Sequence, residues 1–506
     1  MSLARTRSVA VIGVRGHVVE IEVDLAAGLP GATIVGLPDA SLAESRDRVR
    51  AAITNSGEHW PQRRITIGLF PASLPKSGSS FDLACAAAIL EADGVIREGR
   101  LADAVVLGEL ALDGQVRPIR GVLPAVVAAA RAKVSRIFVP TANLAEALLV
   151  PGAGVLGVSS LRHLVLVLRG DALPDTVPDK QSAGASADDF GIDMADVLGQ
   201  AEARRALEVA AAGGHHVYMV GPPGSGKTML ARRLPTILPD LAGDEALETT
   251  AVHSVAGLLP EGCPLVVRPP LRDPHHAASL PALVGGGSGW VRPGEISLAH
   301  NGILFLDEAP EFPRKVLDAL RQPLESASVT IARASGSVVF PAAFTLVLAA
   351  NPCPCGGANT CTCPSTERRR YSARLSGPLM DRVDIRLYVD APAKATMLDD
   401  DATAESSAVV RARVEEARDR AMLRLAPYGL RRNGQVPSAM LRRELAAAPD
   451  ARRYVRELYG RGQLSARGMD RVMRTAWTLA DLAGVGRPGM AEVVEAVGMR
   501  AQAVAA

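Results

Sequence analysis

The residues whose types and spacing best suit chemistry form one glycine-rich loop. Residues 221–228 read Gly-Pro-Pro-Gly-Ser-Gly-Lys-Thr, which matches the phosphate-binding pattern G-x-x-x-x-G-K-[ST]. An apolar run at 217–220 precedes the loop, and residues 229–234 are typical of the first turns of a helix. Backbone N–H groups of such a loop close around a polyphosphate, its lysine reaches the outer phosphates, and its threonine hydroxyl is placed for Mg²⁺. The predicted nucleotide-binding residues are Gly221, Pro222, Pro223, Gly224, Ser225, Gly226, Lys227 and Thr228.

Two adjacent carboxylates follow a second apolar run. Residues 302–306 read Gly-Ile-Leu-Phe-Leu, which is typical of a strand buried on both faces of a parallel sheet, and Asp307 and Glu308 come next. Open α/β sheets bind ligands at this carboxyl end of their strands. Asp307 is predicted to hold Mg²⁺ through water, and Glu308 to polarise the attacking water. An acidic helix cap is the alternative, but together with the upstream loop the pair predicts an ATPase core with ATP and Mg²⁺ as cofactors.

Three further residues are predicted to act on the same phosphates. Asn351 follows another buried-strand pattern, where ring ATPases place an asparagine that orients the hydrolytic water; a turn-capping asparagine is the alternative. Hydrolysis also needs a cation on the γ-phosphate, often from a neighbouring subunit. Arg382 is predicted to supply it, and local pairing with Asp381 or Asp384 is the alternative. Arg467 opens an apolar helix near the end of the chain, from which it could reach the phosphates or simply face solvent.

Four cysteines follow Asn351 in the pattern C-x-C-x₅-C-x-C. They are Cys353, Cys355, Cys361 and Cys363. Four thiolates can complete the tetrahedral shell of a Zn²⁺ ion, although C-x-C is tighter than the usual C-x₂-C spacing. A zinc site and a loop of reduced cysteines near a subunit interface both remain open. The adjacent His275 and His276 are interpreted as structural or pore residues, because neighbouring side chains point apart in most backbone conformations.

The composition limits the class of protein. The chain has 506 residues, 48% of them hydrophobic and 22% charged, which is typical of a soluble globular protein of about three domains. A net charge of +2 gives no overall polyanion-binding signature, and 3% aromatic residues argue against base stacking as the main binding device. No apolar run approaches the ~20 residues of a membrane span, and no signal peptide is predicted. With six cysteines, four of them clustered, we expect a reducing, cytoplasmic setting without disulfides.

The chain is predicted to be an α/β protein in four segments. Residues 1–170 are expected to form an α/β domain, and 171–190, rich in Pro, Ser, Gly and Asp, a linker. Residues 191–394 are the expected ATPase core, and the Ala/Arg/Glu/Leu-rich residues 395–506 a helical lid.

Two insertions enlarge the expected core, one before Asp307 and one between Asp307 and Asn351. In the second, the alternation at 329–340 predicts a β-hairpin with Arg333 near its tip. Such hairpins could line the pore of a ring and follow a phosphate backbone.

The combination of these motifs resembles the YifB/ComM family of magnesium-chelatase-like AAA+ ATPases. The resemblance rests on residues 221–228, on Asp-Pro-His-His at 273–276, on 293–308, and on Asn-Pro-Cys-Pro-Cys-Gly at 351–356, and it covers essentially the whole chain. It implies a homohexameric ring, helix-2 and pre-sensor hairpin insertions in the core, and a helical lid. It also implies a DNA helicase that drives branch migration on single-stranded or branched DNA during uptake or recombination. Because the superfamily includes the protein-remodelling motor of magnesium chelatase, a protein substrate stays open.

The N-terminal segment resembles a different catalytic domain. Residues 74–81 are similar to the serine loop of the Lon protease domain, with Ser80 at the position of the nucleophile, and 108–140 are similar to its following hairpin, helix and strand. A Ser–Lys dyad needs a lysine amine close to the hydroxyl. The matching helix carries Leu123 and Pro124 instead. A Lon-protease-like fold without protease activity is therefore predicted, with rescue by Lys76 or Lys133 as the alternative.

Overall fold

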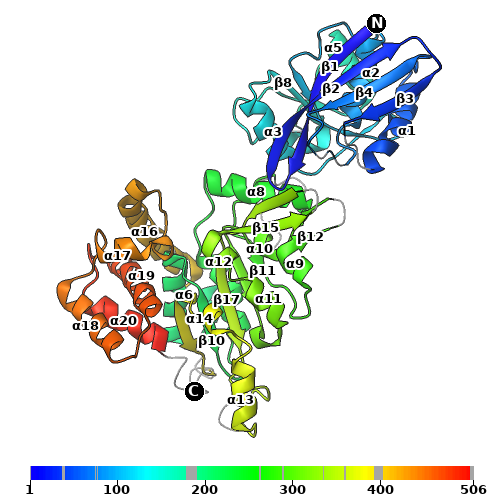
Figure 1. The fold of residues 1–506 in the computed structure, drawn as a ribbon. Coiled ribbons are helices and arrows are strands. Elements are labelled where there is room, and N and C mark those ends of the chain that lie inside the picture. The colour runs from blue at the N-terminus through cyan, green and yellow to red at the C-terminus, as the bar shows by residue number, and fades with distance from the viewer. Residues whose placement is uncertain are drawn as a thin grey trace.

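Two β-sheets organise the chain, one in its first third and one in its middle (Figure 1). The computed structural model describes residues 2–36, 40–74, 76, 78–177, 191–260, 264–287, 290–333, 336–357, 361–391 and 403–501. Most of the expected linker, residues 178–190, lies outside the described residues. We call residues 2–177 the N-terminal unit, 191–391 the central unit and 403–501 the C-terminal helices.

The N-terminal unit is built on a mixed seven-stranded sheet in the order β3-β4-β2-β1-β5-β8-β9. Its strands are β1 (Ser2–Ile12), β2 (Arg15–Ala26), β3 (Gly31–Val35), β4 (Arg64–Phe70), β5 (Ala104–Val106), β8 (Arg136–Pro140) and β9 (Val155–Val158). Strands β1 and β2 pair antiparallel along their whole length, and the small β6 (Glu109–Leu110) and β7 (Val116–Arg117) form a separate hairpin.

Helices bury both faces of this sheet. They are α1 (Ala40–Asn55), α2 (Asp82–Ala92), α3 (Val122–Arg131), α4 (Leu144–Ala147) and α5 (Leu161–Arg169). One apolar cluster contains α2, α5 and residues of α1, and a second contains α3 and α4, because β-strands point alternate side chains to opposite faces.

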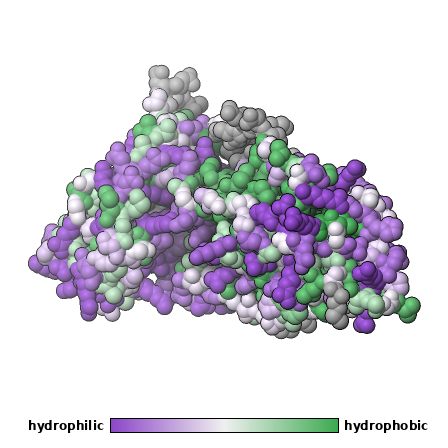
Figure 2. All heavy atoms as spheres, turned by 90° about the horizontal axis from the view of Figure 1, so that it is seen from above, coloured by the Kyte–Doolittle hydropathy of each residue, from purple (hydrophilic) through white to green (hydrophobic). Residues whose placement is uncertain are grey.

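Seen from above, hydrophilic residues cover much of the molecule, with apolar residues scattered between them (Figure 2).

The central unit contains a five-stranded parallel sheet in the order β11-β14-β17-β10-β18. The strands are β10 (Val217–Val220), β11 (Leu271–Arg272), β14 (Ile303–Leu306), β17 (Thr345–Ala350) and β18 (Ile385–Tyr388). Every residue of β14 and β17 is buried. The prediction that these apolar runs form buried parallel strands is therefore confirmed.

Helices and two hairpins complete the central unit. The helices are α6 (Ala201–Gly213), α7 (Lys227–Arg233), α8 (Asp244–Ala256), α9 (Leu280–Val284), α10 (Glu295–Leu298), α11 (Arg314–Ala319), α12 (Pro323–Ser326), α13 (Ser365–Ser372) and α14 (Gly377–Met380). One hairpin pairs β12 (Gly285–Gly286) with β13 (Arg292–Pro293). The other pairs β15 (Ser328–Arg333) with β16 (Gly336–Pro341), which confirms the hairpin predicted over 329–340.

The C-terminal helices pack beside the central sheet. They are α16 (Ser407–Leu425), α17 (Ser438–Arg442), α18 (Pro449–Gly460), α19 (Ala466–Ala483) and α20 (Met490–Ala501). Their buried residues join α6, β10 and β18 in one apolar cluster, so the central unit and these helices share a core. Among the helices described, none combines the length and the apolar character that crossing a membrane requires.

The N-terminal unit contacts the central unit through the turn of its β1–β2 hairpin (Figure 1). Val11, Ile12 and Val14 pack against Phe340 of β16 and Val255 of α8. Beside this cluster, the Gly121 N–H donates to the Ser254 carbonyl (3.3 Å), and the Ser254 hydroxyl donates to the buried carboxylate of Glu146. The stem of the β15–β16 hairpin is therefore held by the N-terminal unit, a contact that no sequence pattern predicted.

Candidate nucleotide-binding site

The glycine-rich loop connects β10 to α7. Gly224 and Gly226 have φ values of +77° and +88°, in the left-handed region that side chains other than glycine disfavour. At Gly221 the constraint is space, because a Cβ atom there would lie 2.1 Å from the carbonyl oxygen of Val389 at the end of β18. The loop therefore has the conformation that its glycines predict.

Lys227 is buried against this loop. Its Nζ donates to the carbonyl oxygens of Gly221 (2.7 Å) and Pro222 (2.9 Å) and to Oδ1 of Asn351 (3.3 Å). Burial lowers the pKa of the ammonium, and the nearby carboxylates of Asp307 and Glu308 act in the opposite direction. A cation with so little contact with water is well suited to bind the outer phosphates of a nucleotide.

Thr228 and Asp307 form an oxygen-rich pair at the same edge of the sheet. The Thr228 hydroxyl donates to Oδ2 of Asp307 (2.6 Å), and Oδ1 of Asp307 accepts the Glu308 N–H (2.9 Å). A hydroxyl and a carboxylate are the hard oxygen ligands that Mg²⁺ prefers, so these side chains fit the predicted ion. Asp273 lies nearby, and burial raises the pKa of its carboxyl, with the charge of Asp307 adding to the effect.

Glu308 comes next in the chain and has a strained backbone conformation. Its φ of 49° and ψ of 43° are left-handed, a conformation that costs a non-glycine residue about 1–2 kcal/mol. Its side chain is 53% exposed, and Oε2 lies 3.6 Å from Nδ1 of His276. A half-exposed carboxylate beside Asp307, the predicted metal ligand, is accessible to a water molecule.

The structure corrects one premise about the two adjacent histidines, while their interpretation as structural or pore residues stays a prediction. The rings of His275 and His276 do not point apart, because their centroids are 4.1 Å from each other. His276 lies beside Glu308. Sequence reasoning missed this neighbour, although the Asp-Pro-His-His stretch at 273–276 was among the motifs that marked the family resemblance.

Asn351 completes the group from the end of β17. This strand pairs in parallel with both β14 and β10, so their carboxyl ends meet at one edge. The structure thus brings Lys227, Thr228, Asp307 and Asn351 together, with Glu308 next to them.

Arg382 lies at the amino ends of the strands, opposite the carboxyl ends that carry the phosphate loop. It precedes β18, whose Ile385 pairs with Val217 at the start of β10, so about 10 Å of strand separates it from the phosphate loop. Its side chain is only 10% exposed, pairs with Glu325, and donates to the carbonyl oxygen of Pro378. The local partner is therefore Glu325, and not Asp381 or Asp384.

Arg467 lies at this end too. Its Nη1 is 3.5 Å from Oδ2 of Asp381, the residue next to Arg382, and its side chain is 65% exposed. Arg467 therefore does not approach the phosphate loop of its own chain from the lid, because Asp381 precedes β18 and the loop follows β10. Both predicted arginines therefore lie near the amino ends of the central strands, and the phosphate loop lies at the carboxyl ends.

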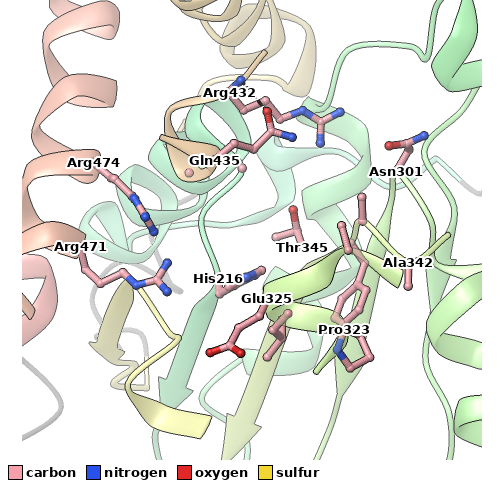
Figure 3. A pocket seen from close by; sticks show the side chains of 16 residues that line it. His216, Asn301, Pro323, Glu325, Ala342, Thr345, Arg432, Gln435, Arg471 and Arg474 are labelled. Carbon is pink, nitrogen blue, oxygen red and sulfur yellow. Dashed lines mark hydrogen bonds between the residues drawn. The ribbon is translucent and has the colours of Figure 1, made fainter. Parts of the chain in front are cut away.

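A cavity of about 390 Å³ lies between the central unit and the C-terminal helices, near Arg382 (Figure 3). Its lining includes His216, Glu325, Arg432, Arg471 and Arg474. Acidic partners hold two of these cations: Arg432 donates to Glu245 (2.9 Å), and Arg471 to Asp384 (3.1 Å). Burial lowers the pKa of His216 to about 4, so this ring is neutral. The cavity opens at the amino ends of β10 and β17, away from the nucleotide site.

In the N-terminal unit, backbone carbonyl groups hold the amine of Lys76, the lysine nearest to Ser80 in the sequence. Lys76 is buried, and its Nζ donates to the carbonyl oxygens of Gly36 (3.0 Å), Leu69 (3.0 Å) and Pro71. These three acceptors use all three ammonium protons. The α3 helix contains Leu123 and Pro124, both buried, and no lysine.

Comparisons with known proteins agree with this geometry. The family described as "Magnesium chelatase, subunit ChlI" matches residues 193–397, "Subunit ChlI of Mg-chelatase" matches 21–143, and "Magnesium chelatase, subunit ChlI C-terminal" matches 404–500.

Several curated proteins are similar over almost their whole length. The chain is 51% identical to the uncharacterized protein Rv2897c of Mycobacterium tuberculosis, covering 99% of each chain. It is 41% identical to the competence protein ComM of Haemophilus influenzae (99% and 98% covered), and 40% identical to the uncharacterized protein YifB of Salmonella typhimurium (99% and 97%). A shorter stretch of 141 residues is 34% identical to the Lon protease of Mycolicibacterium smegmatis, covering 26% of this chain and 18% of that one.

Proposed function

The chain belongs to the YifB/ComM family of magnesium-chelatase-like AAA+ ATPases, and from this membership and the geometry of the site we propose that it is a Mg²⁺-dependent, ATP-hydrolysing motor that works as a homohexameric ring. The observation that carries the proposal is the pair of contacts at one sheet edge, from Thr228 to Asp307 (2.6 Å) and from Lys227 to Asn351 (3.3 Å). They unite the residues that bind a triphosphate, hold its metal and orient water.

Each side chain has a defined task in hydrolysis. Lys227 binds the outer phosphates, and Thr228 and Asp307 hold Mg²⁺, which when bound draws charge from the phosphate oxygens. Asn351 orients the attacking water through its side-chain amide. Glu308 accepts the proton of that water at its carboxylate, for which its 53% exposed side chain is accessible.

The proposed ring is supported by the arginines that lie away from the phosphate loop of their own chain. Phosphoryl transfer needs a cation on the γ-phosphate, but Arg382 stands about one strand length from its own phosphate loop, and Arg467 lies at the neighbouring Asp381. In a head-to-tail ring each chain presents its arginine side to the loop side of the next. Arg382 would exchange Glu325 for a phosphate of the neighbouring site.

We further propose that the ring acts on DNA, single-stranded or branched, as a helicase or branch-migration factor. Three arginines are close in sequence to residues of the apolar cluster around Phe340. Arg15 comes directly after Val14, Arg292 comes directly after Val291, and Arg333 is the last residue of β15. Arg15 and Arg292 are exposed. Cations grouped around a hairpin suit a phosphate backbone, and the competence role in the name of the Haemophilus relative supports a DNA substrate.

The test is ATP turnover measured with single-stranded, duplex and branched DNA. DNA is expected to accelerate turnover, and Arg333→Ala to remove the acceleration while leaving the basal rate unchanged. Arg314→Ala is the matched control, since this arginine is 77% exposed on α11 and outside the hairpin. Turnover indifferent to every DNA would refute the DNA substrate and favour the second candidate, a chelatase-like motor that remodels protein.

For the N-terminal unit we propose a Lon-protease-like fold that has lost protease chemistry. The three carbonyl partners of Lys76 and the absence of lysine from α3 support it. We also propose the boundaries 1–170, 191–394 and 395–506 for the three domains and a cytoplasmic location. ATP-dependent cleavage of casein that disappears in Ser80→Ala would contradict the loss of protease chemistry.

A further inference from the structure

Four sulfur atoms converge in the loop that follows Asn351. The Sγ atoms of Cys353, Cys355, Cys361 and Cys363 all lie within 4.8 Å of one another. Two of these separations are 3.3 Å, between Cys353 and Cys355, and 3.7 Å, between Cys355 and Cys361. A tetrahedral Zn²⁺ ion with Zn–S bonds of about 2.3 Å separates its sulfur ligands by about 3.8 Å. The side chains are thus grouped at the spacing of a single ion.

Other uses of four cysteines fit these distances less well. A disulfide needs sulfur atoms about 2.05 Å apart, much closer than the 3.3 Å found within the first C-x-C pair. An iron–sulfur cluster places several iron and sulfide atoms between its cysteines and so needs wider spacing. Sulfur-only tetrahedral sites favour Zn²⁺ over harder ions such as Mg²⁺. Within the described part of the chain, these four residues are the one group that could hold a metal ion through cysteine or histidine.

The cysteine loop contacts the phosphate loop directly. Gly356 has φ of +71°, and a Cβ atom built there would lie 2.6 Å from Cγ of Pro223. The backbone of the cysteine loop at Gly356 therefore lies against the side chain of Pro223 in the phosphate loop. The first cysteine is also only two residues beyond Asn351, whose Oδ1 accepts a hydrogen bond from Lys227 (3.3 Å). An ion that holds the four cysteines would therefore restrain the backbone next to Asn351 and against Pro223.

We propose that Cys353, Cys355, Cys361 and Cys363 bind one Zn²⁺ ion, which clamps the loop after Asn351 against Pro223 and so positions Asn351 for hydrolysis. The ion is structural, because all four ligands come from the protein and no position is left for water or substrate. Its predicted effect on turnover rests on the proposed ATPase function, whereas its binding does not. The cysteines act here as positioning residues.

The first measurement is the metal content of the full-length protein, purified without chelator or metal-affinity resin. We expect about one zinc per chain. The double variant Cys361→Ser/Cys363→Ser should lose the zinc, and Cys85→Ala should keep it, because Cys85 is buried in α2 of the N-terminal unit. No zinc in the unmodified protein, or full zinc in the double variant, would overturn the site.

The second measurement separates positioning from a loss of folding or nucleotide binding. The double variant should lower kcat about tenfold to a hundredfold and change KM for ATP less than about threefold, because the phosphate loop itself is intact. A general loss of structure would instead abolish nucleotide binding and lower the melting temperature of the central unit. Unchanged kcat in zinc-free protein would refute the positioning role.

A last control distinguishes this proposal from the proposed function. Glu308→Gln should retain its zinc while losing turnover. If the unmodified protein contained zinc but did not hydrolyse ATP, the metal site would stand and the ATPase assignment would fall. If it hydrolysed ATP without zinc, the reverse would hold.

Discussion

The proposed division of the nucleotide site between two chains makes a quantitative prediction about mixed rings. Lys227→Ala removes the cation that binds the phosphates, and Arg382→Ala removes the cation offered from the far edge of the sheet. Each variant alone should lose at least about a thousandfold of its ATP turnover, the scale of an arginine that stabilises the transferring phosphate. Each nevertheless keeps the half of the site that the other lacks.

The magnitude for a mixture follows from counting interfaces. When the two variants are co-expressed in equal amounts and assemble at random, an interface is intact only if a chain with Lys227 faces a chain with Arg382. Each condition is met with a probability of about one half, so about a quarter of the interfaces are complete. Turnover per chain should therefore recover to about a quarter of the unmodified rate, a gain of more than a hundredfold over either variant.

A matched pair of variants supplies the control. Lys227→Ala mixed with Glu308→Gln should recover no ATP turnover, because both residues lie beside the phosphate loop of one chain and no interface regains both.

Glu325→Gln tests the local pairing of Arg382, since it breaks the ion pair but leaves the arginine, and turnover should stay within about threefold of the unmodified protein. An Arg382→Ala protein with normal turnover, or a mixture that stays at the level of its components, would refute the shared site.

Three other predictions concern single features. Thr228→Val removes the hydroxyl that lies 2.6 Å from Asp307, so the Mg²⁺ concentration needed for half-maximal turnover should rise about tenfold, and an unchanged Mg²⁺ titration would contradict this role. Phe340→Ala empties a fully buried position beneath the β1–β2 turn and should cost about 3–5 kcal/mol in chemical denaturation, whereas the 47% exposed Val339→Ala should cost under about 0.5. Burial lowers the pKa of Lys227, so ATP affinity should fall with rising pH before an ordinary lysine loses its proton near about 10.4; affinity that is flat to that pH would show the charge to be unnecessary.

The chemistry of the nucleotide site could be predicted from short stretches of sequence. The loop at 221–228 and the apolar runs before Asp307 and Asn351 each carry their signal within about ten residues. Glycine conformation and the burial of apolar strands are local properties, so the pattern sufficed to predict three parallel strands and the polar residues at their ends. The β15–β16 hairpin was predictable for the same reason, from alternation along its two strands.

Other features depend on which distant segments pack together. Sequence spacing gave no partner for Arg382 other than its neighbours, whereas the fold pairs it with Glu325, 57 residues away. It also gave no reason to place His276 beside Glu308, or the β1–β2 turn beneath Phe340. The distance between Arg382 and its own phosphate loop also depends on the tertiary structure. Arg382 precedes β18 and the loop follows β10, so only the parallel pairing of these two strands shows that they lie at opposite ends of the strands.

The amino-acid sequence alone thus determined which residues are candidates for binding phosphate, holding the metal and orienting water, since each is specified by its immediate neighbours. Only the tertiary structure decided how far apart they stand, which cysteine sulfurs meet, and which arginines stand away from the phosphate loop of their own chain. Those distances depend on the register and packing of segments remote in sequence, where the apolar contacts of the whole core, and not of any one motif, select the arrangement.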